Sequence, residues 1–178
     1  MKKIILEKGK NGYIHIPQRY IPRTLSQKDR SIQKRNLIKT RKLYKKGKYI
    51  QRPPVKSFVS KKSPHIINAE KLYNVKNVLP TNELARKTKC KRSALEKIVN
   101  KGRGAYFSSG SRPNQTAESW GLARLASSIT AGNASIIDYH ILHEGCKPDS
   151  IALKMATKKC KAENKCQKYF QNTTTKIN

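Results

Sequence analysis

Apolar side chains are sparse in the first third of the chain and recur at helical spacing after residue 64. The stretch from Thr24 to Lys46 predicts a helix, because Ser26 can cap its start, Gly47 can end it in the left-handed conformation, and good helix formers lie between. Its apolar positions are too few for a broad buried stripe, so the expected helix is mostly basic. From Gly47 to Pro64, prolines and alternating apolar residues predict an extended basic arm.

Helix signals follow one another closely after the arm. Ser63 and Pro64 predict the start of a short helix, and Thr81 or Asn82 can cap another. Ser93 is followed three residues later by Glu96, and this capping-box spacing predicts the start of a third helix. The second and third helices, joined by a tight turn, resemble half of a helix-turn-helix.

The remaining pattern predicts one loop and three more helices. The glycine- and serine-rich stretch 102–116 is expected to be a structured loop, and Thr116 begins a helix in which Trp120 belongs to the core. Further helices are expected over 134–143 and from Asp149 toward Phe170, followed by a frayed end.

The predicted fold class is therefore mainly α. We expect a small helical domain that contains the helix-turn-helix-like hairpin and is preceded by the basic helix and the extended arm. The expected segments are 1–64 for the basic helix and arm, 65–145 for the helical core, and 146–178 for the C-terminal helix and frayed tail.

The net charge of the chain predicts the kind of partner that it binds. Forty lysines and arginines against ten acids give a net charge of +30, and residues 1–64 hold 20 of the basic and 2 of the acidic residues. Such a density repels itself unless a polyanion neutralises it, so we predict a nucleic acid as the partner, with DNA favoured. The candidate contacts are basic side chains of the helix, arm, hairpin and loop: Lys34, Arg35, Lys39, Arg41, Lys42, Lys45, Lys46, Arg52, Lys61, Lys62, Lys91, Arg92, Lys97, Arg103 and Arg112.

Several of these features have two interpretations. Tyr49 and Phe58 of the arm can stack on bases or anchor the arm to the domain. The leading turns of the hairpin's second helix, including Ala94, can read DNA or form an ordinary wet helical surface. In the loop, exposed amides can cradle a phosphate, whereas the favoured interpretation has Asn114 and its neighbours satisfying backbone groups and capping the next helix.

Other classes of function find little support in the sequence. The sequence has no apolar run of about 18 residues, and the apolar stretch near its start is too short for a signal peptide. We therefore expect a soluble intracellular protein without a membrane partner. The ten acids are scattered singly, and no nucleophile has a recognisable base nearby, which argues against an enzyme.

The cysteines and histidines do not form a convincing metal site. His140, His143 and Cys146 have the spacing of paired zinc ligands but lack a clear fourth ligand, so we predict surface histidines, no metal and no cofactor. Reduced thiols are expected, and a bond between Cys160 and Cys166 is not expected within a straight helix.

Segments from 19 to 157 together resemble an uncharacterised domain family of nucleocytoplasmic large DNA viruses. The segments are RYIPRTLSQKDR at 19–30, RKLYKKGKY at 41–49, KSPHI at 62–66, GRGAYFSSGSRPNQT at 102–116, SWGLARLASSIT at 119–130 and DYHIL at 138–142. The long loop segment is the specific part of this resemblance. The resemblance implies that the protein is located in a virion or in a viral factory in the host cytoplasm, where viral thiol-oxidation machinery can act. It implies no catalytic residue.

Two hypotheses about function follow. In the first, a non-enzymatic viral protein neutralises or organises DNA through phosphate contacts that are mainly independent of sequence. In the second, the protein is a structural minor capsid component whose basic arm binds neighbouring capsid subunits or other virion proteins.

Overall fold

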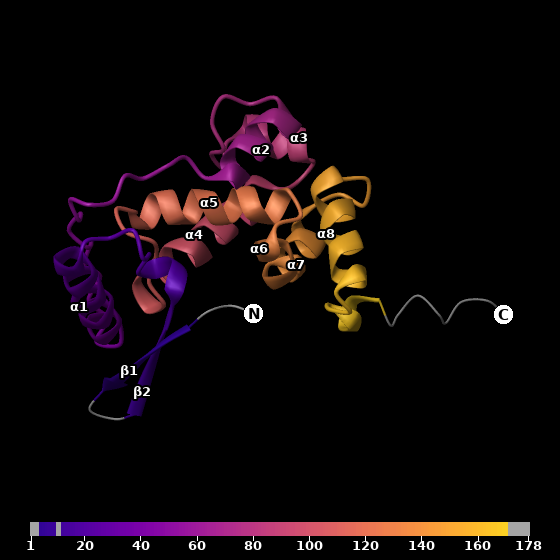
Figure 1. Ribbon diagram of the computed structural model, residues 1–178. Helices are drawn as coiled ribbons and strands as arrows, with labels where there is room; N and C mark the ends of the chain where they lie inside the picture. Colours follow the sequence, from indigo (N-terminus) through magenta and orange to yellow (C-terminus); the bar gives the residue numbers. More distant parts are fainter. Residues whose placement is uncertain (1–3, 10–11, 171–178) are drawn as a thin grey trace. The chain divides into compact units, whose positions relative to one another are not determined.

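The computed structural model describes residues 4–9 and 12–170, with side chains from Ile14 onward. The fold is mainly helical, as predicted. The described elements are β1 (Ile4–Gly9), β2 (Gly12–Pro17), η1 (Gln18–Tyr20), α1 (Gln27–Tyr44), α2 (Pro64–Tyr73), α3 (Asn82–Thr88), α4 (Arg92–Ser108), α5 (Ala117–Ile129), α6 (Asn133–Ile137), α7 (Tyr139–Gly145), α8 (Ile151–Ala162) and η2 (Gln167–Tyr169) (Figure 1).

The chain forms two compact units, each drawn from two segments. Unit 1 comprises residues 1–61 and 103–120, and unit 2 comprises 62–102 and 121–178. The three segments expected from the sequence, with limits near residues 64 and 145, are continuous stretches of the chain, and these limits stay a prediction. Because contacts decide the units, α4 and α5 each contribute residues to both.

Unit 1 combines a β-hairpin, α1, the arm and a loop. β1 and β2 pair antiparallel, with Ile4 opposite Pro17, and the sequence reasoning had not predicted this hairpin. Helix α1 has the predicted ends: the Ser26 hydroxyl accepts from the Asp29 amide at 3.2 Å, and Gly47 takes a φ of +71°. The core of the unit consists of Ile16, Tyr20, Ile21, Leu25, Leu37 and Val55, and half-buried Trp120 packs against it.

The prediction of a loop from residue 102 is wrong for its first half, because α4 continues to Ser108. Gly102 does not form a turn; it allows two helices to pack closely. A Cβ on Gly102 would lie 2.5 Å from the Cα of Gly121 in α5, so only glycine lets the backbones approach this far. The loop proper covers residues 109–116.

Unit 2 is a cluster of short helices around one apolar core. Of the two caps expected from the sequence, Thr81 and Asn82, it is Thr81 that caps α3, and its hydroxyl accepts from the Leu84 amide at 3.3 Å. Ser93 is not a cap, because α4 begins one residue earlier, and the Glu96 carboxylate accepts from Arg92 instead. The largest fully buried side chains of this core are Leu84, Leu95, Ile98, Leu125, Ile129 and Leu142.

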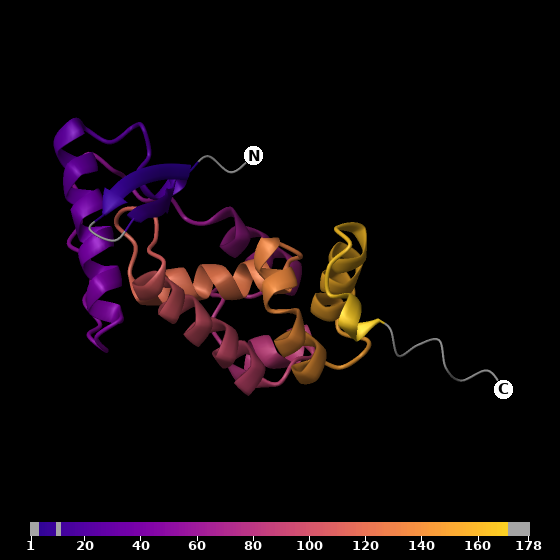
Figure 2. The same ribbon diagram turned by 90° about the horizontal axis from the view of Figure 1, so that it is seen from below.

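The predicted helix at 134–143 is divided at Asp138 into α6 and α7, which contact each other and α8 (Figure 2). Asp138 leaves the helical conformation, and its fully buried carboxylate accepts hydrogen bonds from Arg124 at 2.7 and 2.8 Å and from Ser128 at 2.9 Å. Arg124 thus pairs with a buried carboxylate. Lys101 lies 3.0 Å from the same carboxylate.

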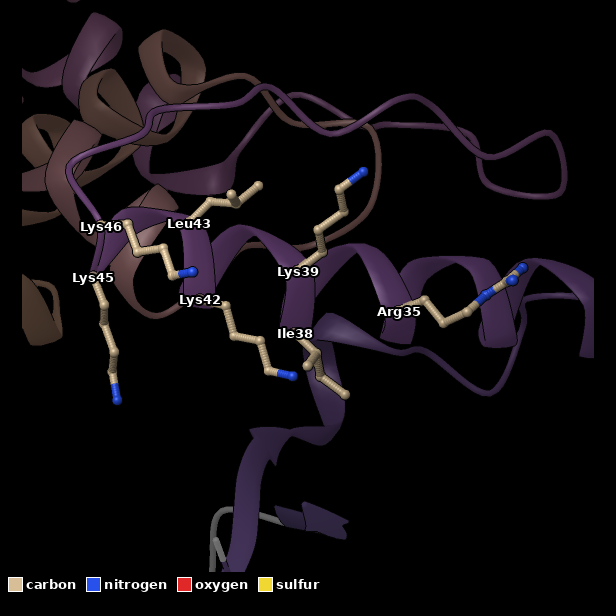
Figure 3. A pocket seen from close by; sticks show the side chains of 7 residues that line it. All are labelled: Arg35, Ile38, Lys39, Lys42, Leu43, Lys45 and Lys46. Carbon is tan, nitrogen blue, oxygen red and sulfur yellow. The ribbon is translucent and has the colours of Figure 1, made fainter. Parts of the chain in front are cut away.

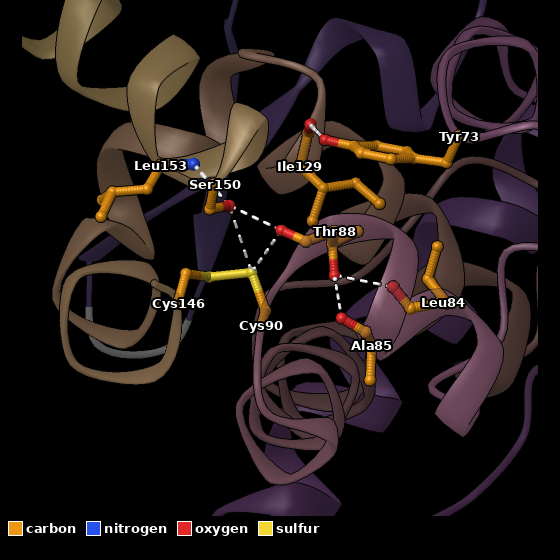
Figure 4. The surroundings of a disulfide bond; sticks show 9 residues. All are labelled: Tyr73, Leu84, Ala85, Thr88, Cys90, Ile129, Cys146, Ser150 and Leu153. Carbon is orange, nitrogen blue, oxygen red and sulfur yellow. Dashed lines mark hydrogen bonds between the residues drawn. A yellow bond between two sulfur atoms is a disulfide. The ribbon is translucent and has the colours of Figure 1, made fainter. Parts of the chain in front are cut away.

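The cysteines correct two predictions, since all four are in disulfides and not reduced. Cys90 pairs with Cys146 across an isolated antiparallel bridge between the α3–α4 turn and the end of α7 (Figure 4). Cys160 pairs with Cys166 because α8 stops at Ala162, well short of Phe170, and Asn164 then takes a positive φ that turns the chain back. The predicted frayed tail, 171–178, lies outside the described residues.

No described helix is long and apolar enough to cross a membrane. Within the described part of the chain, no three His, Cys, Asp or Glu side chains gather as they would around a metal ion. Cys146, one of the ligands considered for zinc, is bonded to Cys90.

Candidate nucleic-acid interface

Helix α1 has two faces of opposite character. The inner face carries Asp29, Gln33, Leu37 and Thr40, all buried. Four residues advance a helix by about 400°, so these positions share one side, and the positions between them point outward. The sequence predicts a mostly basic helix. In the structure the exposed basic side chains of α1 lie on the side opposite this face, and its other basic side chains are half-buried.

Five exposed cations form a line along the outer face, which we call the α1 stripe. Its members are Lys28, Arg35, Lys39, Lys42 and Lys46. Steps of seven, four and three residues keep the first four members on one side of the helix, and Lys46 follows just beyond its last turn. With a rise of about 1.5 Å per residue, the stripe covers about 21 Å from Lys28 to Lys42, the length of about six base pairs of duplex.

Arg35, Lys39 and Lys42 of the stripe line an open hollow along α1, and Ile38 and Leu43 also line it, from opposite sides of the helix (Figure 3). The side chains of Lys45 and Lys46, just beyond the last turn, complete the lining. Aliphatic side chains between cationic ones exclude water from part of the surface without offering an acceptor. The hollow therefore suits the oxygens and sugar carbons of a nucleic-acid backbone.

Apart from Asp29, which adjoins Lys28, the sequence around the stripe contains no acidic residue that could neutralise it. Between Asp29 and Glu70 the chain has none, and within the described residues no ion pair involves a stripe member. Asp29 itself is buried and accepts from the amide and hydroxyl of Ser57 at 2.7 and 2.6 Å. These hydrogen bonds hold the pKa of Asp29 below its ordinary value, so it stays ionised on the inner side of the helix.

Two of the predicted contact residues, Arg41 and Arg52, form hydrogen bonds within unit 1. Arg41 donates to the carbonyl oxygens of Ser109 and His15, which joins α1 to the loop and to β2. Arg52 lies 3.6 Å from the ring centre of Tyr106 and donates to the Tyr106 carbonyl and the Ser111 hydroxyl. Burial lowers the pKa of both guanidinium groups, and both remain cations at neutral pH.

The loop 109–116 follows the favoured interpretation and not the phosphate cradle. Asn114 accepts from the Val55 amide at 2.7 Å and donates to the carbonyls of Val55 and Phe58 at 3.0 and 2.6 Å. The Thr116 hydroxyl accepts from the Ser119 amide at 3.0 Å and so caps α5. The loop's polar groups thus hold the arm in place.

Only part of the DNA-contact surface predicted for the helix-turn-helix-like hairpin is exposed. Ala94 is buried, and a Cβ on Gly145 would lie 2.3 Å from the Ala94 Cβ, so this side of α4 packs against α7. The Lys91 amide donates to the Gly145 carbonyl at 2.7 Å, although the Lys91 side chain is exposed. Lys97 is exposed as well, while Arg92 pairs with Glu96.

The other predicted contacts are dispersed. Lys61 and Arg112 are exposed, Lys62 pairs with Glu70 at 2.6 Å, and Arg103 pairs with Glu118. Lys34 is half-buried on the flank of α1 and has a partner in the structure. The structure therefore brings together Arg35, Lys39, Lys42, Lys45 and Lys46 of the predicted set and adds Lys28, which seven-residue spacing from Arg35 could have revealed.

Residues 17–140 match a family of unknown function, DUF5824. The chain belongs to this family. No curated protein and no solved structure matches the chain.

The family match covers all of α1, the arm and the loop 109–116. The α1 stripe is thus contained in the segment that defines the DUF5824 family, whereas α8 and both cysteines of its disulfide follow that segment. The match assigns no activity to these residues.

Proposed function

We propose that the protein binds nucleic acid, with DNA favoured, through phosphate contacts of the α1 stripe, in a role that is not enzymatic. The observation that carries the proposal is the line of five exposed cations, four of them on one face of a helix whose other face is buried. Five like charges held about 5 to 10 Å apart along the helix repel one another, and a polyanion that lies along the helix relieves this repulsion.

The contacts of this stripe carry no information about base sequence. Lysine and arginine side chains on a phosphate backbone fix position and affinity, while base edges in the grooves determine specificity. The hairpin offers Lys91 and Lys97 as exposed cations, but its leading turn is partly covered by the backbone of residues 145–147. Binding is therefore expected to be mainly independent of sequence.

A salt titration with the full chain tests the proposal. For five phosphate contacts, the logarithm of the affinity for duplex DNA should fall against the logarithm of salt concentration with a slope of about −4.5. The variant Arg35→Gln/Lys39→Gln/Lys42→Gln removes three contacts, so this slope should weaken by about 3.

The matched control removes three exposed lysines of unit 2, Lys154→Gln/Lys158→Gln/Lys165→Gln, and so changes net charge equally. It should retain most of the affinity and slope. Equal losses in the two variants would reduce the effect to net charge and remove the stripe from the proposal. An affinity that does not change with salt in the unmodified protein would overturn the proposal as a whole.

We further propose a viral setting, a virion or a viral factory, which is supported by the resemblance of segment 102–116 and its neighbours to the large DNA virus family. The capsid alternative needs a basic arm that leaves its own unit, and the contacts of Arg52, Val55 and Phe58 with residues 106–114 oppose this. Crosslinking in infected cells should recover the protein with DNA, and recovery with capsid protein alone would favour the alternative.

A further inference from the structure

Tyr49 is the most exposed aromatic ring that the structure describes in unit 1. It is 66% exposed, whereas Tyr20 and Tyr106 of the same unit are buried at 5% and 0%. An exposed apolar side chain on its own is ordinary and needs no explanation. The orientation and the charge around Tyr49 are what distinguish it.

The Tyr49 ring is held in place from two sides. Its centre lies 5.7 Å from that of Tyr44 and 5.3 Å from that of Phe107, with interplanar angles of 84° and 82°. Phe107 in turn meets buried Tyr106 at 5.0 Å. These edge-to-face contacts hold the ring, and because the side chain is still 66% exposed, Tyr49 presents a positioned aromatic surface to solvent.

This surface directly follows the end of the α1 stripe. Gly47 turns the chain beyond the last turn of α1, and the Lys48 amide donates to the Leu43 carbonyl at 2.9 Å, so residues 45–49 fold back onto the helix. Lys45, Lys46 and Lys48, all exposed, lie within four residues of Tyr49. The ring and the cations at the end of the stripe are thus close along the chain, and a flexible strand bound to those cations can bring a base to the ring.

The charge around the ring narrows the class of ligand. An open aromatic face accepts cations, apolar groups or planar π-systems. Cations are disfavoured, because the neighbouring charges are positive and neither 30–69 nor 97–117 contains an acid. A planar group attached to a phosphate fits both the ring and the lysines, and a nucleobase is such a group.

We propose that Tyr49 stacks on an unpaired base of a nucleic acid whose phosphates lie on the α1 stripe. Phe58, the other ring considered for this role, is half-buried against the core of unit 1 and anchors the arm. The ligand is thus a duplex with a single-stranded extension or a single strand, since bases paired within a duplex do not offer their faces. This inference rests on the proposed function and makes it more specific.

Fluorescence anisotropy with three labelled ligands of equal phosphate number tests the inference on the full chain. The ligands are a blunt duplex, a duplex with a DNA extension of five nucleotides, and the same duplex with an RNA extension. The unmodified protein should prefer the extended ligands to the blunt one by at least about fivefold. The two extensions show whether DNA or RNA supplies the unpaired base.

Substitution of Tyr49 identifies the residue responsible. Tyr49→Ala should remove the preference for the extended ligands and leave the affinity for the blunt duplex unchanged, while Tyr49→Phe should keep the preference because the ring remains. Val59→Ala, at an arm residue that is 82% exposed, is the matched control and should behave as the unmodified protein.

The outcomes separate the two proposals. If the unmodified protein binds all ligands equally and Tyr49→Ala changes nothing, the stacking inference fails while phosphate binding stands. If the protein binds none of them, the proposed function fails as well. Photocrosslinking of an extension that contains 5-iodouracil should place the adduct on Tyr49, and an adduct confined to other residues contradicts the inference.

Discussion

Asp138 joins three parts of unit 2 through one carboxylate. Arg124 of α5, Lys101 of α4 and Ser128 of α5 all direct their polar atoms to it, and its side chain is fully buried. Burial pushes the pKa of Asp138 upward, but the hydrogen bonds and charge of Arg124, with Lys101 and Ser128, outweigh it and hold the pKa below its ordinary value. The ionised form is therefore the stabilising one.

Asp138→Asn should lower the free energy of unfolding by about 3 kcal/mol, because it leaves the Arg124 charge without its partner. Since the folded pKa lies below the unfolded one, the contribution of Asp138 is complete above about pH 4 and is lost as pH falls through the folded pKa. Urea unfolding across pH 2.5 to 7 should thus show a smaller acid-dependent loss in the variant than in the unmodified protein.

Asp149→Asn provides the control for this measurement. Asp149 pairs with Lys89 at the surface, where its side chain is 55% exposed, and such pairs contribute little to stability. The control should unfold nearly as the unmodified protein does at neutral pH. Equal stability of Asp138→Asn and Asp149→Asn at pH 7 would contradict the role given to the buried carboxylate.

At the scale of elements, two glycines of α4 differ in what surrounds them. Gly102 packs against Gly121, where an added Cβ would also lie 3.2 Å from the Cβ of Arg124, whereas nothing lies within 4 Å of a Cβ added at Gly104. The same substitution in one helix therefore has opposite expected effects.

Gly102→Ala should destabilise the protein by about 1 to 3 kcal/mol, because backbone atoms of α5 must move to admit the methyl group. Gly104→Ala should stabilise it by about 0.5 to 1 kcal/mol, since alanine favours the helix and meets no neighbour. Urea midpoints of the two variants give the comparison, and a stabilised Gly102→Ala would contradict the close approach of α4 and α5.

The elements also show which structural features a sequence can predict. The caps at Ser26 and Thr81 are local, because each hydroxyl bonds an amide three residues away, and both were predicted. The extension of α4 through Gly102 was not, since the reason for that glycine lies in Gly121. The β-hairpin was not predicted, although Lys-Asn-Gly at 10–12 between two apolar runs is a sequence signal for one.

In the candidate site, too, some features can be predicted from the sequence and others only from the structure. The stripe on α1 could be predicted because a helix places residues at seven- and four-residue spacing on one side. Arg41 and Arg52 look equivalent to their basic neighbours in the sequence, and only the folded position of Ser109 and Tyr106 shows that they bind within the protein. Tyr49 was raised as a stacking residue, but its exposure and its neighbours had to come from the structure.

At the scale of the whole molecule, two disulfides add to a small apolar core. The bond between Cys90 and Cys146 spans 56 positions and that between Cys160 and Cys166 spans 6. By loop-closure entropy, the first should stabilise the fold by about 4 kcal/mol and the second by about 2 kcal/mol. Cysteines paired in this way also require a compartment or a catalyst that oxidises thiols.

Thermal unfolding with and without reducing agent measures this contribution. Cys90→Ser/Cys146→Ser should lower the midpoint more than Cys160→Ser/Cys166→Ser, because it opens the longer loop. Reducing agent should lower the midpoint of the unmodified protein at least as far as the first variant. Four titratable thiols in the native, unreduced protein would contradict both bonds.

The bond between Cys90 and Cys146 also changes what a cut in the backbone does. It closes residues 90–146 into a covalent ring that contains all of α4, α5, α6 and α7. A protease that cleaves one peptide bond anywhere inside the ring leaves both pieces joined through sulfur, with the stripe-bearing first part still attached to α8. The molecule therefore tolerates a single nick in more than a quarter of its length without coming apart.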